Sequence, residues 1–276
     1  MSNKWNWKFV ICFVAIAMAL TVMEICVGNF PVDLFRFPLN ILCLALWLVM
    51  LGIIYRQRAT STIARFMLST NAVWLSFVLV ASVGITLGLQ RKPSSDAWLI
   101  VGAILFVLSH LTLITMRGWR NARGVRWRFT LLHLGLILAL GAGFWGAPDR
   151  EQLRIIVNEE YNNQAYNIKG ESRILDYGMR LADLNIEYGA NGSVASYKAE
   201  VDIDGRRATI SVNNPYQRTW YEKIYLISNS NDACILEVVR EPWQWLTMTG
   251  IVMLIAGAVM MFISGPRRSN IESKEQ

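Results

Sequence analysis

The stretch Phe129-Thr-Leu-Leu-His-Leu-Gly-Leu-Ile-Leu-Ala-Leu-Gly-Ala-Gly-Phe-Trp-Gly146 decides the fold. It runs for eighteen residues without a charge, and a helix needs roughly 17 to 25 apolar residues to cross a bilayer. An arginine-rich segment precedes it, and Ala147-Pro-Asp opens a polar region behind it. The stretch therefore predicts a membrane-spanning helix that leads directly into an exported domain.

Five other stretches have the same apolar character. The complete set is Phe9–Val27, Leu39–Tyr55, Met67–Leu89, Ala97–Met116, Phe129–Gly146 and Trp243–Ser264. The composition agrees, because 54% of the residues are hydrophobic and 17% are charged, whereas about a quarter are charged in an average globular chain. We therefore expect a membrane α + β protein, a six-helix transmembrane bundle with a small extracytoplasmic all-β domain between the fifth and sixth spans.

The net charge of +7 divides unevenly along the chain. Residues 147–242 hold 15 acidic and 11 basic side chains, a balance of −4, and the remaining residues hold 16 basic and 5 acidic, a balance of +11. The basic charge lies beside the apolar segments, so no basic face is left for nucleic acid. We expect membrane lipid as a partner and no nucleic acid.

The orientation follows from the lysines and arginines that flank the spans. With a cytoplasmic N-terminus, thirteen of them lie on the cytoplasmic side and three, Arg36, Arg91 and Lys92, on the other. Cytoplasmic loops carry such an excess. The expected order is a transmembrane region over 1–146, an extracytoplasmic domain over 147–242, a sixth span over 243–264 and a cytoplasmic tail over 265–276, with the first segment retained as an anchor.

The exported region shows the alternation of half-buried strands. Strands are expected at Leu153–Val157, Met179–Tyr188, Ser196–Ile203, Arg207–Val212 and Lys223–Ser228. Asn191-Gly192 and Asp204-Gly205 are hairpin signals. They predict that Ile186–Tyr188 pairs with Ser196–Glu200 and that Lys198–Ile203 pairs with Arg207–Val212, in an antiparallel sandwich or an open barrel. The region has no paired catalytic carboxylates, phosphate loop or histidine, which argues against a hydrolase.

The four cysteines do not form a framework. Cys12, Cys26 and Cys43 lie in or near spans, and Cys234 alone lies in the exported region. A structural disulfide in that region is therefore not expected, and the spacing suits no metal site. We interpret these residues as buried free thiols.

The two histidines of the chain, His110 and His133, both fall inside spans. An ionisable side chain in hydrocarbon is costly and marks a functional site by default. His110 lies seven residues before Arg117 and His133 five after Arg128, so both are expected roughly 7–11 Å inside the cytoplasmic boundary. Neutral imidazole is a good haem-iron ligand. The alternative is that each imidazole makes an interhelical hydrogen bond.

Small residues mark faces for close helix packing. Gly135, Ala139 and Gly143 recur at every fourth position of the fifth span, and Gly84 and Gly88 do the same in the third. Stripes of this kind let helices approach closely in membranes. We expect the fifth span to be central in the bundle, with the neighbouring arginines available to haem propionates.

Several segments in order resemble the ResB (CcsB) family of cytochrome c biogenesis proteins. They are Phe66-Met-Leu-Ser69, Gly84-Ile-Thr-Leu-Gly-Leu-Gln90, the helix led by His133, Met179–Tyr188, Ile210-Ser-Val-Asn-Asn-Pro215 and Leu236–Pro242. The resemblance covers about residues 66–264. The exported domain is smaller than in most members, and Asn214 stands where members often have histidine, so no second exported ligand is carried over.

The resemblance implies a bacterial inner-membrane subunit that acts with a CcsA-type partner and hands haem to apocytochrome c outside the membrane. His133 is then the candidate haem-iron ligand, and His110 a weaker second candidate. The chain supplies no obvious acid, base or nucleophile for thioether formation, so we expect a required but non-catalytic subunit of a holocytochrome c synthase complex.

Two other functions are open at this point. In a b-type electron-transfer subunit, His110 and His133 would hold one stable, redox-active haem within this chain. In a haem-free assembly factor, the sheet would bind another protein and both histidines would only pack. The electron-transfer subunit predicts stable, stoichiometric haem in this chain alone, and the assembly factor predicts that both histidines tolerate glutamine with normal cytochrome c maturation.

Overall fold

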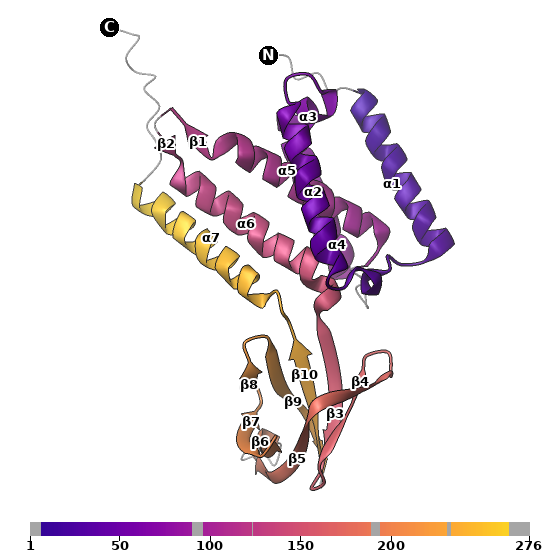
Figure 1. The fold of residues 1–276 in the computed structure, drawn as a ribbon, viewed down its shortest axis with the longest axis vertical. Coiled ribbons are helices and arrows are strands. Elements are labelled where there is room, and N and C mark those ends of the chain that lie inside the picture. The colour runs from indigo at the N-terminus through magenta and orange to yellow at the C-terminus, as the bar shows by residue number, and fades with distance from the viewer. Residues whose placement is uncertain (1–6, 90–95, 123, 189–193, 231–232, 265–276) are drawn as a thin grey trace. The chain divides into compact units, whose positions relative to one another are not determined.

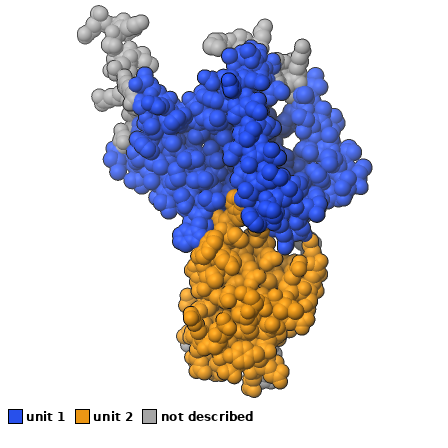
Figure 2. Space-filling model, in the orientation of Figure 1, with its two compact units in different colours: residues 1–148, 245–276 blue, residues 149–244 orange. Residues whose placement is uncertain are grey.

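The computed structural model describes residues 7–89, 96–122, 124–188, 194–230 and 233–264. The chain divides into two compact units, residues 1–148 with 245–276 and residues 149–244 (Figure 2). The expectations that lie outside the described residues concern Lys4, Arg91, Lys92, Arg123, Asn191-Gly192, Arg267, Arg268 and Lys274.

The first unit is helical (Figure 1). Its helices are α1 (Trp7–Val27), a 3-10 turn at Val32–Phe35, α2 (Leu39–Arg56), α3 (Thr62–Met67), α4 (Thr70–Leu89), α5 (Trp98–Gly118), α6 (Trp127–Gly146) and α7 (Gln244–Ser264). The short strands β1 (Arg120–Asn121) and β2 (Gly124–Val125) pair between α5 and α6. Within the described residues, α2, α4, α5, α6 and α7 are long and apolar enough to cross a membrane. Five of the six predicted spans are thus confirmed as helices of that length, whereas α1 is described as apolar over the shorter stretch Ile11–Val27.

The third predicted span begins later than expected. The sequence placed it at Met67–Leu89, but α3 ends at Met67 and α4 begins at Thr70. The Ser69 hydroxyl accepts a hydrogen bond from the Ala72 backbone N–H at 3.4 Å, which is the contact of a helix N-cap. A new helix therefore starts at this serine, and the break leaves the last carbonyls of α3 without partners inside that helix.

Helix α5 forms the centre of the helical unit and contacts α1, α2, α4 and α6. Leu108 and Leu113 are fully buried on it. The Trp47 indole of α2 donates a hydrogen bond to the buried Ser109 hydroxyl of α5 at 3.0 Å. This contact explains one tryptophan inside a span, because an indole N–H in an apolar interior needs an acceptor. The predicted central helix was α6, whereas α5 carries most of the contacts.

Helices α6 and α7 pack backbone against backbone (Figure 1). A Cβ at Gly135 would lie 2.8 Å from the Gly250 carbonyl oxygen, and a Cβ at Gly250 would lie 2.6 Å from the Ala139 nitrogen. The close approach predicted for Gly135 and Ala139 is therefore confirmed. A Cβ at Gly143 or at the α4 glycines would meet no atom of the described chain within 4 Å, so these positions are not helix contacts here.

In the described residues, the second unit is an eight-stranded antiparallel sheet. Its strands are β3 (Glu151–Val157), β4 (Asn162–Asn167), β5 (Ser172–Tyr188), β6 (Val194–Ile203), β7 (Arg206–Ser211), β8 (Tyr216–Thr219), β9 (Glu222–Ser230) and β10 (Ala233–Arg240). Their order is β7-β6-β5-β4-β3-β10-β9-β8. Strands that follow one another in the chain are neighbours in the sheet, apart from β7 and β8, which form its two edges. The first strand, β3, pairs with the last, β10.

The sheet curls into a nearly closed barrel. Its edge strand β7 contacts both β8 and β9, and an isolated bridge joins Ser211 to Asn214 where β7 turns into β8. Of the two expected architectures, the open barrel is the one observed. Inward-facing residues alternate with exposed ones, as on β3, where Leu153, Ile155 and Val157 enter the core.

Both predicted strand pairings are present. Ile186 pairs with Tyr197, and Ala199 pairs with Ile210. At the second hairpin, Asp204 and Gly205 both have positive φ, 52° and 76°, as a type I′ turn requires. Strands β4, β8 and β10 were not predicted.

Candidate functional site

His133 lies on α6 with its ring half-buried. Its Nδ1 lies 2.9 Å from the Phe129 carbonyl oxygen one turn earlier. Because a carbonyl oxygen only accepts, this nitrogen carries the proton and Nε2 keeps its lone pair. The imidazole is thereby held in the tautomer that offers Nε2 to an electron-pair acceptor.

Phe129 fixes the plane of the His133 ring. The two rings stack with their centroids 3.9 Å apart and an interplanar angle of 24°. The Arg126 guanidinium lies over the same phenyl ring, 4.8 Å from its centroid. On the α5 side, a Cβ at Gly118 would lie 2.5 Å from the phenyl Cζ. Phe129 is therefore enclosed between two helices, and it orients the histidine that follows it by one turn.

His110 is located differently, because only 3% of it is exposed. Its Nδ1 donates to the Met67 carbonyl oxygen at 2.8 Å. Further along α5, Arg117 Nη1 donates to the Leu68 carbonyl at 2.9 Å. These carbonyls have no partner inside α3, because the helix ends there. His110 and Arg117 therefore supply the missing hydrogen bonds at the break between α3 and α4.

The structure does not bring the two imidazoles into contact. They lie on the neighbouring helices α5 and α6, but among the described residues no hydrogen bond or ring contact joins them, and each has its own backbone acceptor. The arginine-rich segment between these helices is also partly engaged, because Arg126 donates to the Gly118 carbonyl at 3.2 Å. Arg120 is exposed there.

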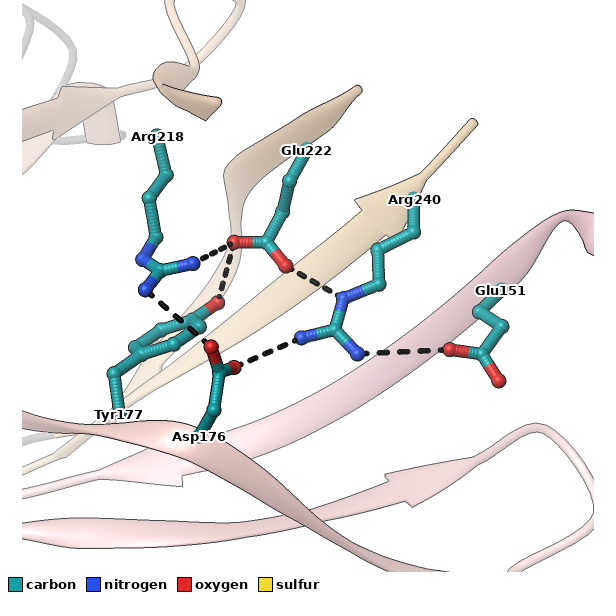
Figure 3. Close-up of polar contacts among 6 residues, drawn as sticks. All are labelled: Glu151, Asp176, Tyr177, Arg218, Glu222 and Arg240. Carbon is teal, nitrogen blue, oxygen red and sulfur yellow. Dashed lines mark hydrogen bonds and ion pairs between the residues drawn. The ribbon is translucent and has the colours of Figure 1, made fainter. Parts of the chain in front are cut away.

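A cluster of six polar side chains at one end of the barrel was not predicted. It consists of Glu151, Asp176, Tyr177, Arg218, Glu222 and Arg240, and we call it the charged cluster (Figure 3). Its centre is the Glu222 carboxylate, which is 1% exposed. Tyr177 donates to Glu222 Oε1 at 3.0 Å, Arg218 donates to the same oxygen at 3.2 Å, and Arg240 donates to Oε2.

The other two carboxylates complete the charged cluster. Asp176 bridges both guanidiniums, at 3.3 Å from Arg240 and 3.6 Å from Arg218, and Glu151 lies 3.6 Å from Arg240. The Arg218 guanidinium also covers the Tyr177 ring, 3.8 Å from its centroid. Burial and the Glu222 charge raise the pKa of Tyr177, so its phenol stays protonated and donates. The cluster closes this end of the barrel with paired charges.

The signal for the charged cluster was present in the strand pattern. Every second residue of β9 and β10 faces the core. Glu222 stands at such a position with the buried Ile224 and Leu226, and Arg240 stands at one with Val238 and Leu236. A charged residue at an inward-facing position loses its hydration, so it needs a partner that compensates for that loss. Cross-strand register supplies these partners, since Arg240 pairs with Glu222 on one side and with Glu151 on the other.

Cys234 is expected to be chemically inert in the folded protein. It is fully buried on β10, and this burial raises the pKa of its thiol to about 11, so at pH 8 only about one thiol in a thousand is ionised. Maleimide should therefore leave Cys234 unlabelled in the native chain and label it fully in urea, as peptide mass spectrometry would show. Labelling of the native protein at the rate of a free thiol would contradict the buried position.

The helices and the sheet together define a class. Within the part of the chain that the structure describes, five helices of spanning length are joined to a folded antiparallel unit, which indicates a multi-pass membrane protein with a β unit between two of the helices. Residues 122–233 match the model of the ResB-like family, which confirms the resemblance over that part of the chain. The matched residues include His133 and most of the sheet but not His110.

A comparison with solved structures gives a distant likeness. One matching chain is cytochrome c heme lyase CcmF, with a TM-score of 0.38 and 12% sequence identity. The match covers 69% of this chain and 34% of that one, so this chain spans about a third of that protein's length. No curated protein matches the sequence.

Proposed function

We propose that the chain is a membrane subunit of the machinery that delivers haem to apocytochrome c and attaches it outside the membrane. The observation that supports this function is the ResB-like match over residues 122–233, because it covers the helix of His133 and the sheet that follows it. In this proposal the subunit handles haem together with a CcsA-type membrane partner, and the partner or the apocytochrome binds at the exported sheet.

His133 is the residue that we propose to hold the haem iron. Haem iron takes a neutral imidazole nitrogen as an axial ligand. The Nδ1 hydrogen bond to Phe129 leaves Nε2 as the donor atom, and a metal-bound histidine ordinarily donates its other N–H to such an acceptor. The half-buried ring is accessible from the bundle surface, which suits transfer of a cargo between two subunits.

His110 fits this role less well. Its ring is enclosed by α3 and α5, so access for a macrocycle would require these helices to separate. Its hydrogen bond to the α3 terminus supports a structural function. The exposed Arg120 and its neighbours in the arginine-rich segment are the side chains that we propose for the haem propionates, by charge-assisted hydrogen bonds.

The test is the haem content of the purified complex. A His133→Ala variant should lose haem by about tenfold or more, since even indirect support of a metal ligand is worth 10- to 100-fold in affinity. Added imidazole should restore part of the haem absorption, because it replaces the missing ligand without restoring the side chain. Cytochrome c maturation in cells should fall in parallel.

The matched control is His110→Gln. An amide at this position can still donate to the Met67 carbonyl, so haem content should stay close to that of the parent. Unchanged haem in His133→Ala would contradict the proposed ligand. Equal loss in both variants, with stable haem in the chain purified without a partner, would favour the electron-transfer subunit instead.

A further inference from the structure

Two turns of the sheet carry large apolar side chains in solvent. Ile168, in the turn between β4 and β5, is 75% exposed, and Trp220, in the turn between β8 and β9, is 52% exposed. A tryptophan with half its surface in water is poorly placed unless another phase covers it, because its large ring gains most from leaving water. These side chains lie outside the charged cluster and are not used by the haem proposal.

The strand register puts both turns at the same end of the sheet. Asn167 pairs with Leu153, so Ile168 lies level with the beginning of β3. At the other turn, Glu222 pairs with Arg240 at the end of β10. In the sheet order, β4 and β5 flank β3 on one side, and β8 and β9 flank β10 on the other. The two turns therefore bracket the strands by which the chain enters and leaves the sheet (Figure 1).

This end of the sheet is also the end nearest to the spans along the chain. Glu151 follows the last residue of α6 by five residues, and Arg240 precedes the first residue of α7 by four. An extended chain covers at most about 3.6 Å per residue, so these strand ends lie within roughly 18 Å of the helix ends whatever the orientation of the two units.

Contacts inside the sheet unit hold the two connecting segments together. The Trp243 indole donates to the Asp149 carboxylate at 2.7 Å, and Arg150 forms an ion pair with Glu241 at 3.0 Å. The Glu241 backbone N–H donates to the Tyr221 carbonyl at 2.8 Å, which joins the Trp220 turn to the exit segment. The segment that leaves the sheet toward α7 thus runs beside the turn that carries the exposed tryptophan.

We propose that Ile168 and Trp220 insert into the outer lipid interface beside the helix ends. Tryptophan is enriched at that interface, where its ring leaves water and its N–H stays hydrated. A fluid lipid surface accepts separate side chains on turns that lie on either side of β3 and β10, whereas a protein partner requires a continuous complementary patch. This proposal depends on the helices spanning the membrane and does not depend on haem.

The experiment uses the full chain in nanodiscs of phosphatidylcholine with phosphatidylglycerol. Cys12, Cys26 and Cys43 are replaced by alanine, and nitroxide labels are placed at Ile168→Cys or Trp220→Cys. The matched control is Glu160→Cys, an exposed position in the turn at the other end of β3. Collision with oxygen, which concentrates in lipid, is compared with collision with a water-soluble nickel chelate.

At both turn positions we expect severalfold lower accessibility to the nickel chelate than at Glu160→Cys, with higher accessibility to oxygen. Equal nickel accessibility at all three positions would overturn the lipid contact. Shielding of the turns from both reagents would also overturn it, because it would mean that a protein covers them. The same measurement in the His133→Ala chain should give the same result, so failure of the haem proposal is distinguishable from failure of this one.

Discussion

Replacement of Glu222 by alanine is expected to destabilise the sheet unit by about 3–5 kcal/mol. This is a large fraction of the roughly 5–15 kcal/mol that stabilises an ordinary domain. The substitution removes a carboxylate that is 1% exposed and that accepts hydrogen bonds from Tyr177, Arg218 and Arg240. Within the charged cluster, Arg218 then keeps Asp176 and Arg240 keeps Asp176 and Glu151, and the buried phenol loses its acceptor.

The magnitude follows from burial. Arg218 and Arg240 are 23% and 24% exposed, so water replaces the lost carboxylate only in part. Leaving one charge of a buried pair without its partner costs far more than the pair contributes relative to apolar residues. Glu222→Gln should lie between the parent and Glu222→Ala, because the amide oxygen still accepts from Tyr177 but carries no charge.

Labelling of Cys234 measures this effect in the intact chain. The thiol is buried in the core of the same sheet, so it reacts only when the sheet opens. A loss of about 3 kcal/mol should raise the labelling rate by roughly 100-fold. The control is Glu200→Ala, which removes the carboxylate of an exposed ion pair with Arg207 at 3.6 Å and should change the rate little, as exposed pairs contribute about 0–1 kcal/mol. Similar rates for the two variants would show that the charged cluster does not stabilise the sheet.

Hydropathy predicted much of the helical unit. A membrane span must form all its backbone hydrogen bonds within one helix, so it is recognisable in the sequence by its length and its apolar residues. The error at the third span has a local cause. Phe66-Met-Leu-Ser69 continues the apolar run, and hydropathy alone does not detect that Ser69 begins a new helix. The hydrogen bonds from His110 and Arg117 that stabilise this break come from a segment more than forty residues away.

Clear alternation led to the strands that were predicted. Weak alternation explains why β4 was missed, but β10 was missed although its residues alternate. Strand β4 has the sequence Asn-Asn-Gln-Ala-Tyr-Asn, with one buried residue, Ala165, and it forms because β3 and β5 flank it. The alternation of Cys234, Leu236 and Val238 in β10 was a usable signal that was overlooked. The inward-facing positions of Glu222 and Arg240 were a local signal, but the partners of these two residues depend on the register of β3, β9 and β10, which no local pattern contains.

The candidate site, too, was predictable only in part from the sequence. Both histidines were candidates because an ionisable side chain in an apolar span is rare, but the different hydrogen-bond partners of the two imidazoles were not visible in the sequence. His133 finds its acceptor within its own helix, four residues earlier, whereas His110 finds it on another helix. Only the second contact depends on tertiary structure, and it is the one that favours a structural role.

Replacement of Gly250 by valine is expected to separate α6 from α7. A Cβ at this position would lie 2.6 Å from both the Ala139 nitrogen and the Gly135 carbonyl oxygen, and these are backbone atoms that no side-chain rotation can move. Close packing between small residues drives helix association in membranes, so a branched side chain here forces the whole interface apart. Insertion of extra methyl groups into a well-packed core costs about 1–3 kcal/mol. Because two backbones fix the contact at Gly250, we expect a cost at or above the upper end of that range.

The measurement is the temperature at which the detergent-solubilised chain loses its monodisperse peak in size-exclusion chromatography, expected to fall by about 5 °C or more for Gly250→Val. Gly143→Val on α6 is the matched control, because a Cβ there meets nothing within 4 Å and the helix-propensity change is the same. If the peak is lost at the same temperature in both variants, the α6–α7 contact does not determine the thermal stability of the chain. If only Gly250→Val is affected, α7 is held to α6, and the helix that leads into the sheet and the helix that leaves it form one packed pair.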